Sequence, residues 1–323
     1  MKDKKSRWLL FFYYGGILAG AALFLYQLVH GLQGFRDQPI GPGQVPYIIA
    51  AVGTILVAYA LQMLAYACLL RGLDVRIPVT EVLAHYVLSF LPRYIPGTVW
   101  GYLGRSEWLR MRCGIPYSTS ALSSILEAGI SLLTAVVVSG VSYSWYTAAG
   151  LFRWIIILAA PLTCWLSWYA FAMASRLPLL RKTGWFPFSS DTRINIRLGY
   201  WLLICFIYYL LWFCYGGMLN LLLQALTRQS VGLTQPIFAY ALAWTAGFLI
   251  PLVPSGLGAR ETVLSSLLIQ QLQLSTQSAS AVSATCRIVV YVAELTWLVA
   301  GQILARITSR RGPEQAEVHS FRP

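Results

Sequence analysis

The stretch Leu91–Glu107 reads Leu-Pro-Arg-Tyr-Ile-Pro-Gly-Thr-Val-Trp-Gly-Tyr-Leu-Gly-Arg-Ser-Glu, so an apolar run is interrupted by two prolines and then by three glycines. A similar break occurs in the last quarter of the chain, where Phe248–Glu261 reads Phe-Leu-Ile-Pro-Leu-Val-Pro-Ser-Gly-Leu-Gly-Ala-Arg-Glu. Each copy places two closely spaced prolines before a glycine-rich turn and a basic and an acidic residue. Two matched helix breaks within hydrophobic sequence indicate a binding site of the kind that membrane transporters carry.

The composition around these breaks is that of a membrane protein. Apolar residues make up 58% of the 323 residues and charged residues only 11%, which is far less charge than a soluble globular domain carries. We therefore expect an all-α polytopic membrane protein. The net charge of +13 is then a signal of topology and of attraction to anionic lipid, and no nucleic-acid partner is expected, because the basic residues are scattered between apolar spans.

Six apolar stretches are long enough to cross about 30 Å of hydrocarbon. They are Trp8–His30, Tyr47–Leu70, Ser118–Val141, Leu151–Ala174, Leu198–Leu223 and Ser278–Ala305. The apolar runs beside the two breaks are too short to cross, so we expect each break to form a re-entrant helical hairpin, at about residues 82–112 and 237–272. Residues 1–305 would then form a single transmembrane domain, and residues 306–323 a polar cytoplasmic tail.

The distribution of lysines and arginines favours hairpins that enter and leave on the same side. With a cytoplasmic N-terminus, eighteen lysines and arginines fall inside, and only Arg36, Arg153 and Arg228 fall outside, which is a strong positive-inside bias. Three spans separate the hairpins, so the second enters from the opposite side and the two halves form an inverted repeat. We expect both termini in the cytoplasm and the chain in the cell (inner) membrane.

Three charges are expected near the middle of the membrane, where an isolated charge costs about 2.5–3.5 kcal/mol. The polar stripes that carry them at helical spacing are Ser120, Ser124, Glu127, Ser131 and Thr134 on one span, and Ser280, Ser283, Arg287, Tyr291 and Glu294 on the other. Alignment of the two halves places Glu127 opposite Arg287. Two interpretations remain open: a structural Glu127–Arg287 ion pair that ties the halves together, and a polar site that binds a charged headgroup.

The hairpin turns favour an anionic ligand. They would expose backbone N–H groups at the start of a returning half-helix, where the helix dipole attracts anions, and arginines lie nearby, so phosphate is the expected group. The expected substrate-binding residues are Arg93, Pro96, Gly97, Arg105, Glu127, Pro254, Ser255, Gly256, Gly258, Arg260, Glu261, Arg287, Tyr291 and Glu294. The competing interpretation is that Gly97, Gly101 and Gly104 only permit close helix packing.

The sequence contains no signature of a cofactor or metal site. The six cysteines have no C-x-x-C spacing, so we expect buried thiols rather than zinc ligands or a disulfide framework. The phosphate-binding pattern G-x-x-x-x-G-K-[ST] is also missing, which argues against direct use of ATP. We expect no catalytic residue, no metal and no cofactor.

The two break motifs, together with Glu127 between them, resemble the lysylphosphatidylglycerol synthase transmembrane family over roughly residues 8–305. That family includes the flippase half of the multiple peptide resistance factor. The resemblance implies a flippase or scramblase for an anionic or headgroup-modified (aminoacylated or glycosylated) phospholipid or a polyprenyl-phosphate lipid. Synthase members carry a soluble aminoacyl-transfer domain after the membrane region. Only eighteen residues follow Ala305, so we expect no such activity here and a separate lipid-modifying enzyme as a partner.

Two alternatives to lipid translocation remain. One is a membrane enzyme that acts on a lipid-linked substrate, with Glu127 or Glu294 as general base. It is disfavoured because the sequence shows no convincing metal cluster and no carboxylates paired at short spacing. The other is a small-solute secondary transporter or a non-catalytic partner built on the same repeat. An oligomer is compatible with each of these readings.

Overall fold

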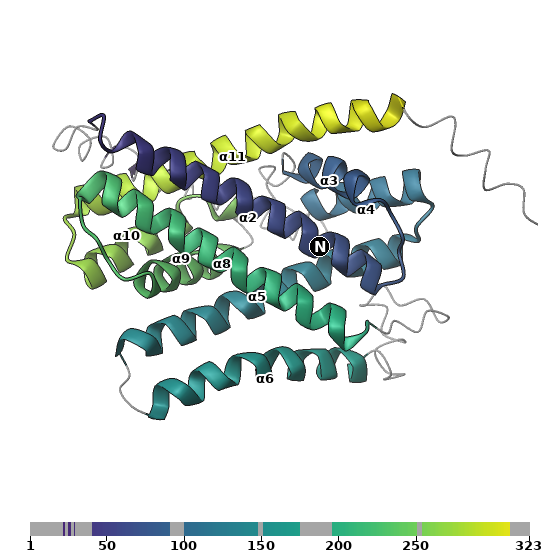
Figure 1. The fold of residues 1–323 in the computed structure, drawn as a ribbon, viewed down its shortest axis with the longest axis horizontal. Coiled ribbons are helices and arrows are strands. Elements are labelled where there is room, and N and C mark those ends of the chain that lie inside the picture. Colours follow the sequence, from purple (N-terminus) through teal and green to yellow (C-terminus); the bar gives the residue numbers. More distant parts are fainter. Residues whose placement is uncertain are drawn as a thin grey trace, which may run out of the picture.

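A computed structural model describes residues 41–90, 100–147, 151–174, 196–250 and 254–310, together with the single positions 22, 25, 26 and 29. The regular elements in these ranges are helices (Figure 1). The α-helices are α2 (Val45–Gly72), α3 (Val79–Tyr86), α4 (Trp100–Cys113), α5 (Tyr117–Thr147), α6 (Leu151–Ala174), α8 (Leu198–Thr227), α9 (Thr234–Phe248), α10 (Ala259–Leu272) and α11 (Thr276–Arg310). Two 3-10 turns, η1 (Val87–Ser89) and η3 (Pro254–Gly256), lie at the breaks.

Within the described residues, four helices are long and apolar enough to cross a membrane: α2, α5, α8 and, over Thr276–Leu304, α11. Each corresponds to one of the predicted spans. Helix α6 has the predicted bounds, and Ile157–Met173 within it is an apolar stretch. The predicted span Trp8–His30 falls outside the described residues except for the four single positions. The all-helical membrane class is therefore confirmed, and six spans remain a prediction.

The helix ends follow local sequence signals. Helix α2 carries Pro46 in its first turn, where a missing N–H costs nothing. Helix α8 ends at Arg228, whose φ of 56° turns the chain away from the helix. Helix α10 begins after Gly258, and the carboxylate of Glu261, three residues on, accepts the Gly258 N–H at 2.6 Å, which satisfies a backbone donor that the helix itself leaves without a partner.

The helices form two series of the same order. The first series, α2 to α5, has helices of 28, 8, 14 and 31 residues, and the second, α8 to α11, has helices of 30, 15, 14 and 35 residues. In both series the proline and glycine break lies between the second and third helix. A long helix, a short helix, a break, a short helix and a second long helix thus occur twice.

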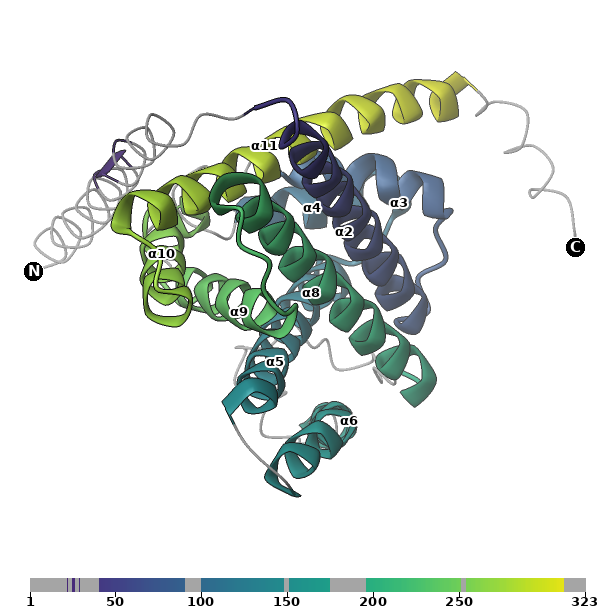
Figure 2. The same ribbon diagram turned by 60° about the vertical axis from the view of Figure 1, so that its left-hand side comes forward.

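The two series pack closely against each other. Helices α2 and α8 lie side by side and run in opposite directions. Gly72 at the end of α2 contacts Ile196 and Tyr200 at the start of α8, and Tyr47 at the start of α2 borders the same surface pocket as Gln224 near the end of α8. Helix α5 packs on α9, and α11 packs on α3 (Figures 1 and 2). The last long helix of each series therefore contacts the second helix of the other.

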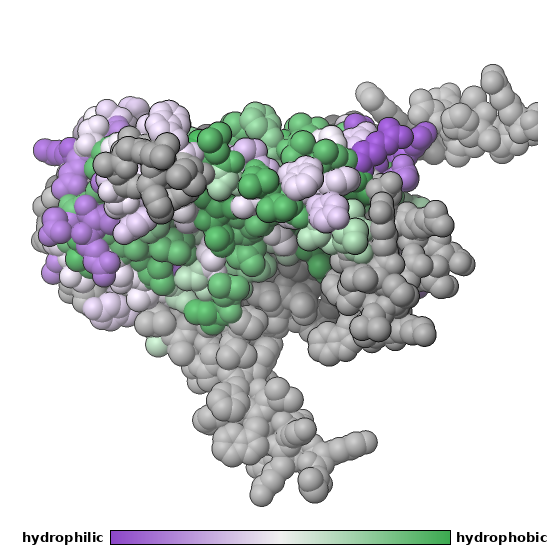
Figure 3. Space-filling model, turned by 90° about the horizontal axis from the view of Figure 1, so that it is seen from below, coloured by the Kyte–Doolittle hydropathy of each residue, from purple (hydrophilic) through white to green (hydrophobic). Residues whose placement is uncertain are grey.

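The surface has the character expected of a protein in a bilayer. Figure 3 shows hydrophobic side chains over the middle of one face and hydrophilic side chains toward its two ends. Large apolar side chains are exposed on the outside of the bundle, among them Leu158 (69% exposed) and Ile49 (65%). Polar side chains of α5 instead face inward, with Ser120 and Thr134 fully buried. The polarity gradient is thus reversed from that of a soluble protein, as lipid contact requires.

Candidate functional site

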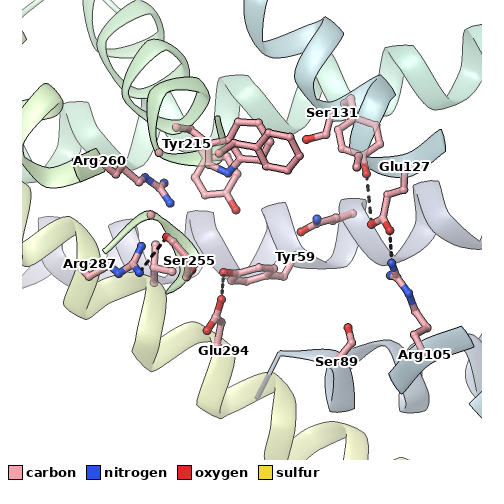
Figure 4. Close-up of a pocket in the computed structure, with 18 residues that line it drawn as sticks. Tyr59, Ser89, Arg105, Glu127, Ser131, Tyr215, Ser255, Arg260, Arg287 and Glu294 are labelled. Carbon is pink, nitrogen blue, oxygen red and sulfur yellow. Dashed lines mark hydrogen bonds and ion pairs between the residues drawn. The ribbon is translucent and has the colours of Figure 1, made fainter. Parts of the chain in front are cut away.

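A polar cavity of about 130 Å³ lies between the two series (Figure 4). Roughly 10–15 Å³ of this measure is needed for one water molecule, so the cavity could hold about ten. Its charged and polar lining consists of Tyr59, Gln62, Ser89, Arg105, Glu127, Ser131, Tyr208, Tyr215, Ser255, Arg260, Arg287 and Glu294. These residues come from every described helix and turn of the two series except α3 and α9. Helix α9 adds Trp244, Gly247 and Phe248 to the wall, and α6 contributes no lining residue. The cavity therefore belongs to both series at once.

At one end of the cavity, Glu127 of α5 is held by three side chains. Nη2 of Arg105 on α4 donates to Oε2 of Glu127 at 2.5 Å, and both side chains are almost completely buried. The hydroxyl of Tyr86 donates to Oε1, and that of Tyr208 lies 3.5 Å from the same oxygen. The guanidinium of Arg105 also lies over the ring of Tyr66, 4.1 Å from its centroid. Both oxygens of this buried carboxylate are thus engaged.

At the other end, Arg287 of α11 pairs with Glu261 of α10. The Nε of Arg287 lies 3.5 Å from Oε1 of Glu261, and both side chains are at most 3% exposed. Arg287 also donates from Nε to the hydroxyl of Tyr291 at 2.9 Å and from Nη2 to the carbonyl of Ser255 at 3.3 Å. The second oxygen of Glu261 caps α10 at Gly258. Arg287 is therefore bonded to the turn of the second break.

Glu127 and Arg287, the two charges that alignment of the halves placed opposite each other, have partners other than each other. Glu127 pairs with Arg105 and Arg287 with Glu261, in place of the direct Glu127–Arg287 pair considered from the sequence. Each pair joins the short helix after a break to the long helix that follows it. The charges of the pair are exchanged between the two series: the long helix supplies the carboxylate in the first series and the guanidinium in the second.

One expected anion contact is occupied by the protein itself. Backbone N–H groups of the second break were expected to meet a ligand, but the N–H of Gly258 donates to Glu261. Arg260 is the more suitable group. Its guanidinium carbon lies 4.4 Å from the ring centroid of Tyr240, its side chain points into the cavity (Figure 4), and it forms no ion pair with any of the described residues. Arg260 is thus a cation in the cavity wall without a paired carboxylate in the described ranges.

The remaining carboxylate, Glu294, lies between the two ends. The hydroxyl of Tyr59 on α2 donates to its Oε1 at 2.6 Å. Two neutral groups also face the cavity, the amide of Gln62 and the hydroxyl of Ser131. Neither side chain forms a hydrogen bond with any of the residues that the structure describes. The cavity wall therefore presents neutral donors and acceptors as well as the Glu294 carboxylate and the arginines at the two ends.

The structure brings most of the predicted site residues together. Arg105, Glu127, Ser255, Gly256, Arg260, Arg287 and Glu294 line the cavity. Glu261 lines a small adjoining pocket, Pro254 opens the turn η3, Gly258 precedes α10, and Tyr291 supports Arg287. Arg93, Pro96 and Gly97 of the first break lie outside the described residues.

Sequence reasoning missed the aromatic and amide part of the site. Tyr59 and Gln62 line the cavity from α2, Tyr208 and Tyr215 from α8, and Trp244 from α9. A signal was present, because Tyr59 and Gln62 are three residues apart and Tyr208 and Tyr215 seven apart, so each pair shares one face of its helix. Polar groups on one face of an apolar span point inward. Within the described ranges, no group of three or more His, Cys, Asp or Glu residues could hold a metal ion.

Comparison with known proteins supports a membrane domain of one family. The family model for the lysylphosphatidylglycerol synthase TM region matches residues 8–297. A search of curated proteins gives no match. The matched range includes both breaks, both ion pairs and the whole of the cavity lining. The chain therefore belongs to the lysylphosphatidylglycerol synthase transmembrane-region family, and it is a multi-pass membrane protein related to lipid handling.

Proposed function

We propose that the protein is a flippase or scramblase that translocates an anionic or headgroup-modified phospholipid, or a polyprenyl-phosphate lipid. The observation that carries this proposal is a polar cavity inside an apolar bundle, with Arg260 in its wall and no ion pair to that arginine among the described residues. A guanidinium away from bulk water is costly unless an anion compensates it. The planar guanidinium matches a phosphate group with two parallel hydrogen bonds.

The substrate's acyl chains stay in the bilayer while the headgroup passes through the cavity. Polar and charged lining removes most of the cost of moving a phosphate through hydrocarbon, because protein dipoles and arginines replace its hydration. Arginines lie at both ends of the cavity, Arg105 at one and Arg260 and Arg287 at the other (Figure 4). A headgroup that crosses would therefore meet a cation near entry and near exit.

The inverted repeat belongs to this proposal. Helices α2 and α8 run in opposite directions side by side, and each series packs its last helix on the second helix of the other. Helices α3 and α9 have 8 and 15 residues, so they extend about 12 and 22 Å at 1.5 Å per residue. Both fall short of about 30 Å of hydrocarbon, which fits two re-entrant hairpins that enter from opposite sides. Rocking of one series against the other would expose the cavity to each side in turn.

We expect transport without chemical change of the lipid. A general base needs a carboxylate oxygen that can reach the substrate proton, and both oxygens of Glu127 are held by Arg105, Tyr86 and Tyr208. Any modification of the headgroup would then be the work of a separate enzyme. The chain would lie in the cell (inner) membrane with both termini in the cytoplasm, as the positive-inside count favours.

The experiment that tests the proposal is translocation in proteoliposomes. Purified protein is reconstituted with fluorescent phosphatidylglycerol in both leaflets, and a membrane-impermeant quencher reports the lipid that reaches the outer leaflet. The protein should raise the quenched fraction of the fluorescent lipid above one half. Arg260→Gln should slow the quenching of lipid from the inner leaflet about tenfold or more, which corresponds to about 1.4 kcal/mol. Arg110→Gln is the matched control, because Arg110 is exposed on α4 and pairs only with the exposed Glu107.

The result that would overturn the proposal is clear. If no anionic, aminoacylated, glycosylated or polyprenyl-phosphate lipid is translocated faster than in protein-free liposomes, the protein is not a lipid flippase or scramblase. If the lipid recovered from the liposomes is chemically altered, the enzyme alternative replaces it. If Arg260→Gln and Arg110→Gln slow translocation equally, translocation does not depend on the cavity.

A further inference from the structure

The cavity also has the chemistry of a site for hydroxyl groups. Gln62 from α2 and Ser131 from α5 both line it. Neither side chain has a hydrogen-bond partner among the described residues, although the Ser131 residue is only 7% exposed. Polar groups that face a roomy cavity can bond to water or to a ligand, so a ligand with several donors and acceptors would fit this arrangement. Apolar or purely ionic ligands would leave the amide and hydroxyl unsatisfied.

The wall next to these groups is aromatic. Trp244 and Phe248 of α9 both line the cavity, and their rings are stacked with centroids 5.0 Å apart and planes 13° apart. Tyr215 of α8 lines it as well, and its ring is stacked on that of Tyr240. Aromatic faces carry negative partial charge and pack well against weakly positive C–H groups. A sugar ring presents such a C–H face together with hydroxyl groups at its edge.

The cationic end lies on the other side of this aromatic and neutral section. Figure 4 shows Arg260, Arg287 and Ser255 at one end, Tyr59 and Tyr215 in the middle, and Ser131, Glu127 and Arg105 at the other end. A phosphate at Arg260 would therefore place the group attached to it next to the aromatic wall and the neutral side chains. Along the cavity, the arginine that would bind the phosphate is therefore followed by the groups that would bind hydroxyls.

We propose that the headgroup this cavity binds is a glycosyl phosphate, with the phosphate at Arg260 and the sugar between the aromatic wall and the pair Gln62 and Ser131. This deepens the proposed function and rests on it, because it names the class of lipid for the same cavity. The shared chemistry is a phosphate diester that carries a sugar. The sugar is attached directly in a polyprenyl phosphosugar and through glycerol in a glycosylated phosphatidylglycerol.

An aminoacylated headgroup fits the cavity less well. Its ammonium group needs a carboxylate acceptor, and the carboxylates at the cavity already accept from the protein. Glu127 accepts from Arg105 and two tyrosines, and Glu294 accepts from Tyr59. Glu261 pairs with Arg287 and caps α10. An ammonium would have to share Glu294 with Tyr59 or compete with the other donors, whereas a sugar hydroxyl can bond to Gln62 and Ser131 without competing with any of them.

The test compares lipids that share acyl chains and a fluorescent label and differ only in headgroup. Reconstituted full-length protein is assayed with phosphatidylmethanol, which has the phosphate but no hydroxyl, with glucosylated and with lysylated phosphatidylglycerol, and with a polyprenyl phosphoglucose. A glucosylated lipid should be translocated about tenfold faster than the lysylated one, since one or two hydrogen bonds worth about 1 kcal/mol each separate them. The two glucosylated lipids distinguish the two sources of the same chemistry.

Variants of the neutral groups supply the second readout. Gln62→Leu and Ser131→Ala should each slow the glucosylated lipid about five- to tenfold, which is more than they slow phosphatidylmethanol. Ser139→Ala is the matched control, because Ser139 is also buried on α5 but, among the described residues, bonds only to the carbonyl of Ala135 and does not line the cavity. Thermal unfolding of each variant in detergent shows whether it folds.

The outcomes separate this inference from the proposed function. If phosphatidylmethanol or the lysylated lipid moves and the glucosylated lipids move no faster, the glycosyl phosphate assignment is wrong while lipid translocation stands. If Gln62→Leu and Ser131→Ala slow every lipid equally, the two side chains are structural and the assignment is also wrong. If none of the lipids moves, both proposals fall together.

Discussion

Arg287 and Glu261 form an almost completely buried ion pair, 3.5 Å between Nε and Oε1, that joins α11 to α10. The corresponding pair in the other series, Arg105 and Glu127, joins α4 to α5 with the charges exchanged. In the sequence, both pairs follow a proline and glycine break. The ion pairs therefore fix the short helix after each break to the long helix that follows.

Removal of one charge from the buried pair is expected to destabilise the protein strongly. Glu261→Gln should lower the free energy of unfolding by about 3–5 kcal/mol, because it leaves Arg287 buried without its counter-charge, while the amide can still cap Gly258. Thermal unfolding in detergent measures the change. Glu261→Gln combined with Arg287→Gln should recover part of the loss.

The control for this prediction is Glu107→Gln. Glu107 pairs with Arg110 at the surface of α4, and exposed ion pairs contribute little to stability. The thermal unfolding midpoint of Glu107→Gln should therefore equal that of the parent protein. Equal destabilisation by Glu107→Gln and Glu261→Gln, or a double variant that is less stable than either single one, would contradict the assigned role of the buried pair.

The two tyrosines that contact Glu127 should differ in their contribution. Tyr86 makes a short bond to Oε1, whereas the Tyr208 hydroxyl lies 3.5 Å from the same atom. Hydrogen bonds to a charged group contribute about 1.5–3 kcal/mol and weaken steeply with distance. Tyr86→Phe should therefore lower the free energy of unfolding by about 2 kcal/mol and Tyr208→Phe by less than about 0.5 kcal/mol. Chemical denaturation of the two variants in the same detergent measures both free energies of unfolding. A larger loss for Tyr208→Phe than for Tyr86→Phe would show that Tyr208 is the principal donor.

Two adjacent glycines on α8 allow a sharp test of helix packing. A Cβ added at Gly216 would lie 2.2 Å from Cγ1 and 2.9 Å from Cα of Ile237 on α9, whereas one added at Gly217 would meet only Cγ2 of Thr54 at 3.7 Å. Gly216→Ala should destabilise by about 1–3 kcal/mol through overpacking. Gly217→Ala should be neutral or slightly stabilising, because alanine favours the helix. Thermal midpoints of the two variants give the comparison, and equal midpoints would mean that α8 and α9 do not approach so closely.

The sequence predicts which polar residues face the inside of the bundle better than it predicts which side chains they contact there. Ser120, Glu127 and Ser131 were expected on one face of a span, and all three are buried, because polar side chains at helical spacing avoid lipid. The partners could not be predicted in the same way. Tyr59 and Glu294 are 235 residues apart, and their contact depends on how α11 crosses α2. Periodicity locates a face of a helix, but it contains no information about which helix covers that face.

The ion pairs show the same limit. Alignment of the two halves brings Glu127 and Arg287 to equivalent positions, which made a direct pair between them attractive. In the structure, each of the two residues instead pairs with a local partner, on the short helix after the break. The sequence signal for Arg105 and Glu261 was the basic and acidic residue that follows each break.

The turn of the second break should tolerate change at Ser255 far better than at Gly256. Gly256 has a φ of 66°, and a Cβ there would lie 2.9 Å from both Cα and the carbonyl oxygen of Gly247. These are backbone atoms of α9, so no side-chain rotation can relieve the clash, and both residues line the cavity. Gly256→Ala should therefore lower the free energy of unfolding by about 2 kcal/mol or more and slow lipid translocation in proteoliposomes even at temperatures where the fold is intact.

Ser255 is the matched comparison, because it has a φ of 53° and bonds to Arg287 through its backbone carbonyl. Ser255→Gly keeps that bond and removes the cost of a left-handed non-glycine residue. Its free energy of unfolding should be equal to that of the parent or up to about 1 kcal/mol higher. If Gly256→Ala transports lipid at the parental rate, the close contact between the turn and α9 is not required for passage of the headgroup.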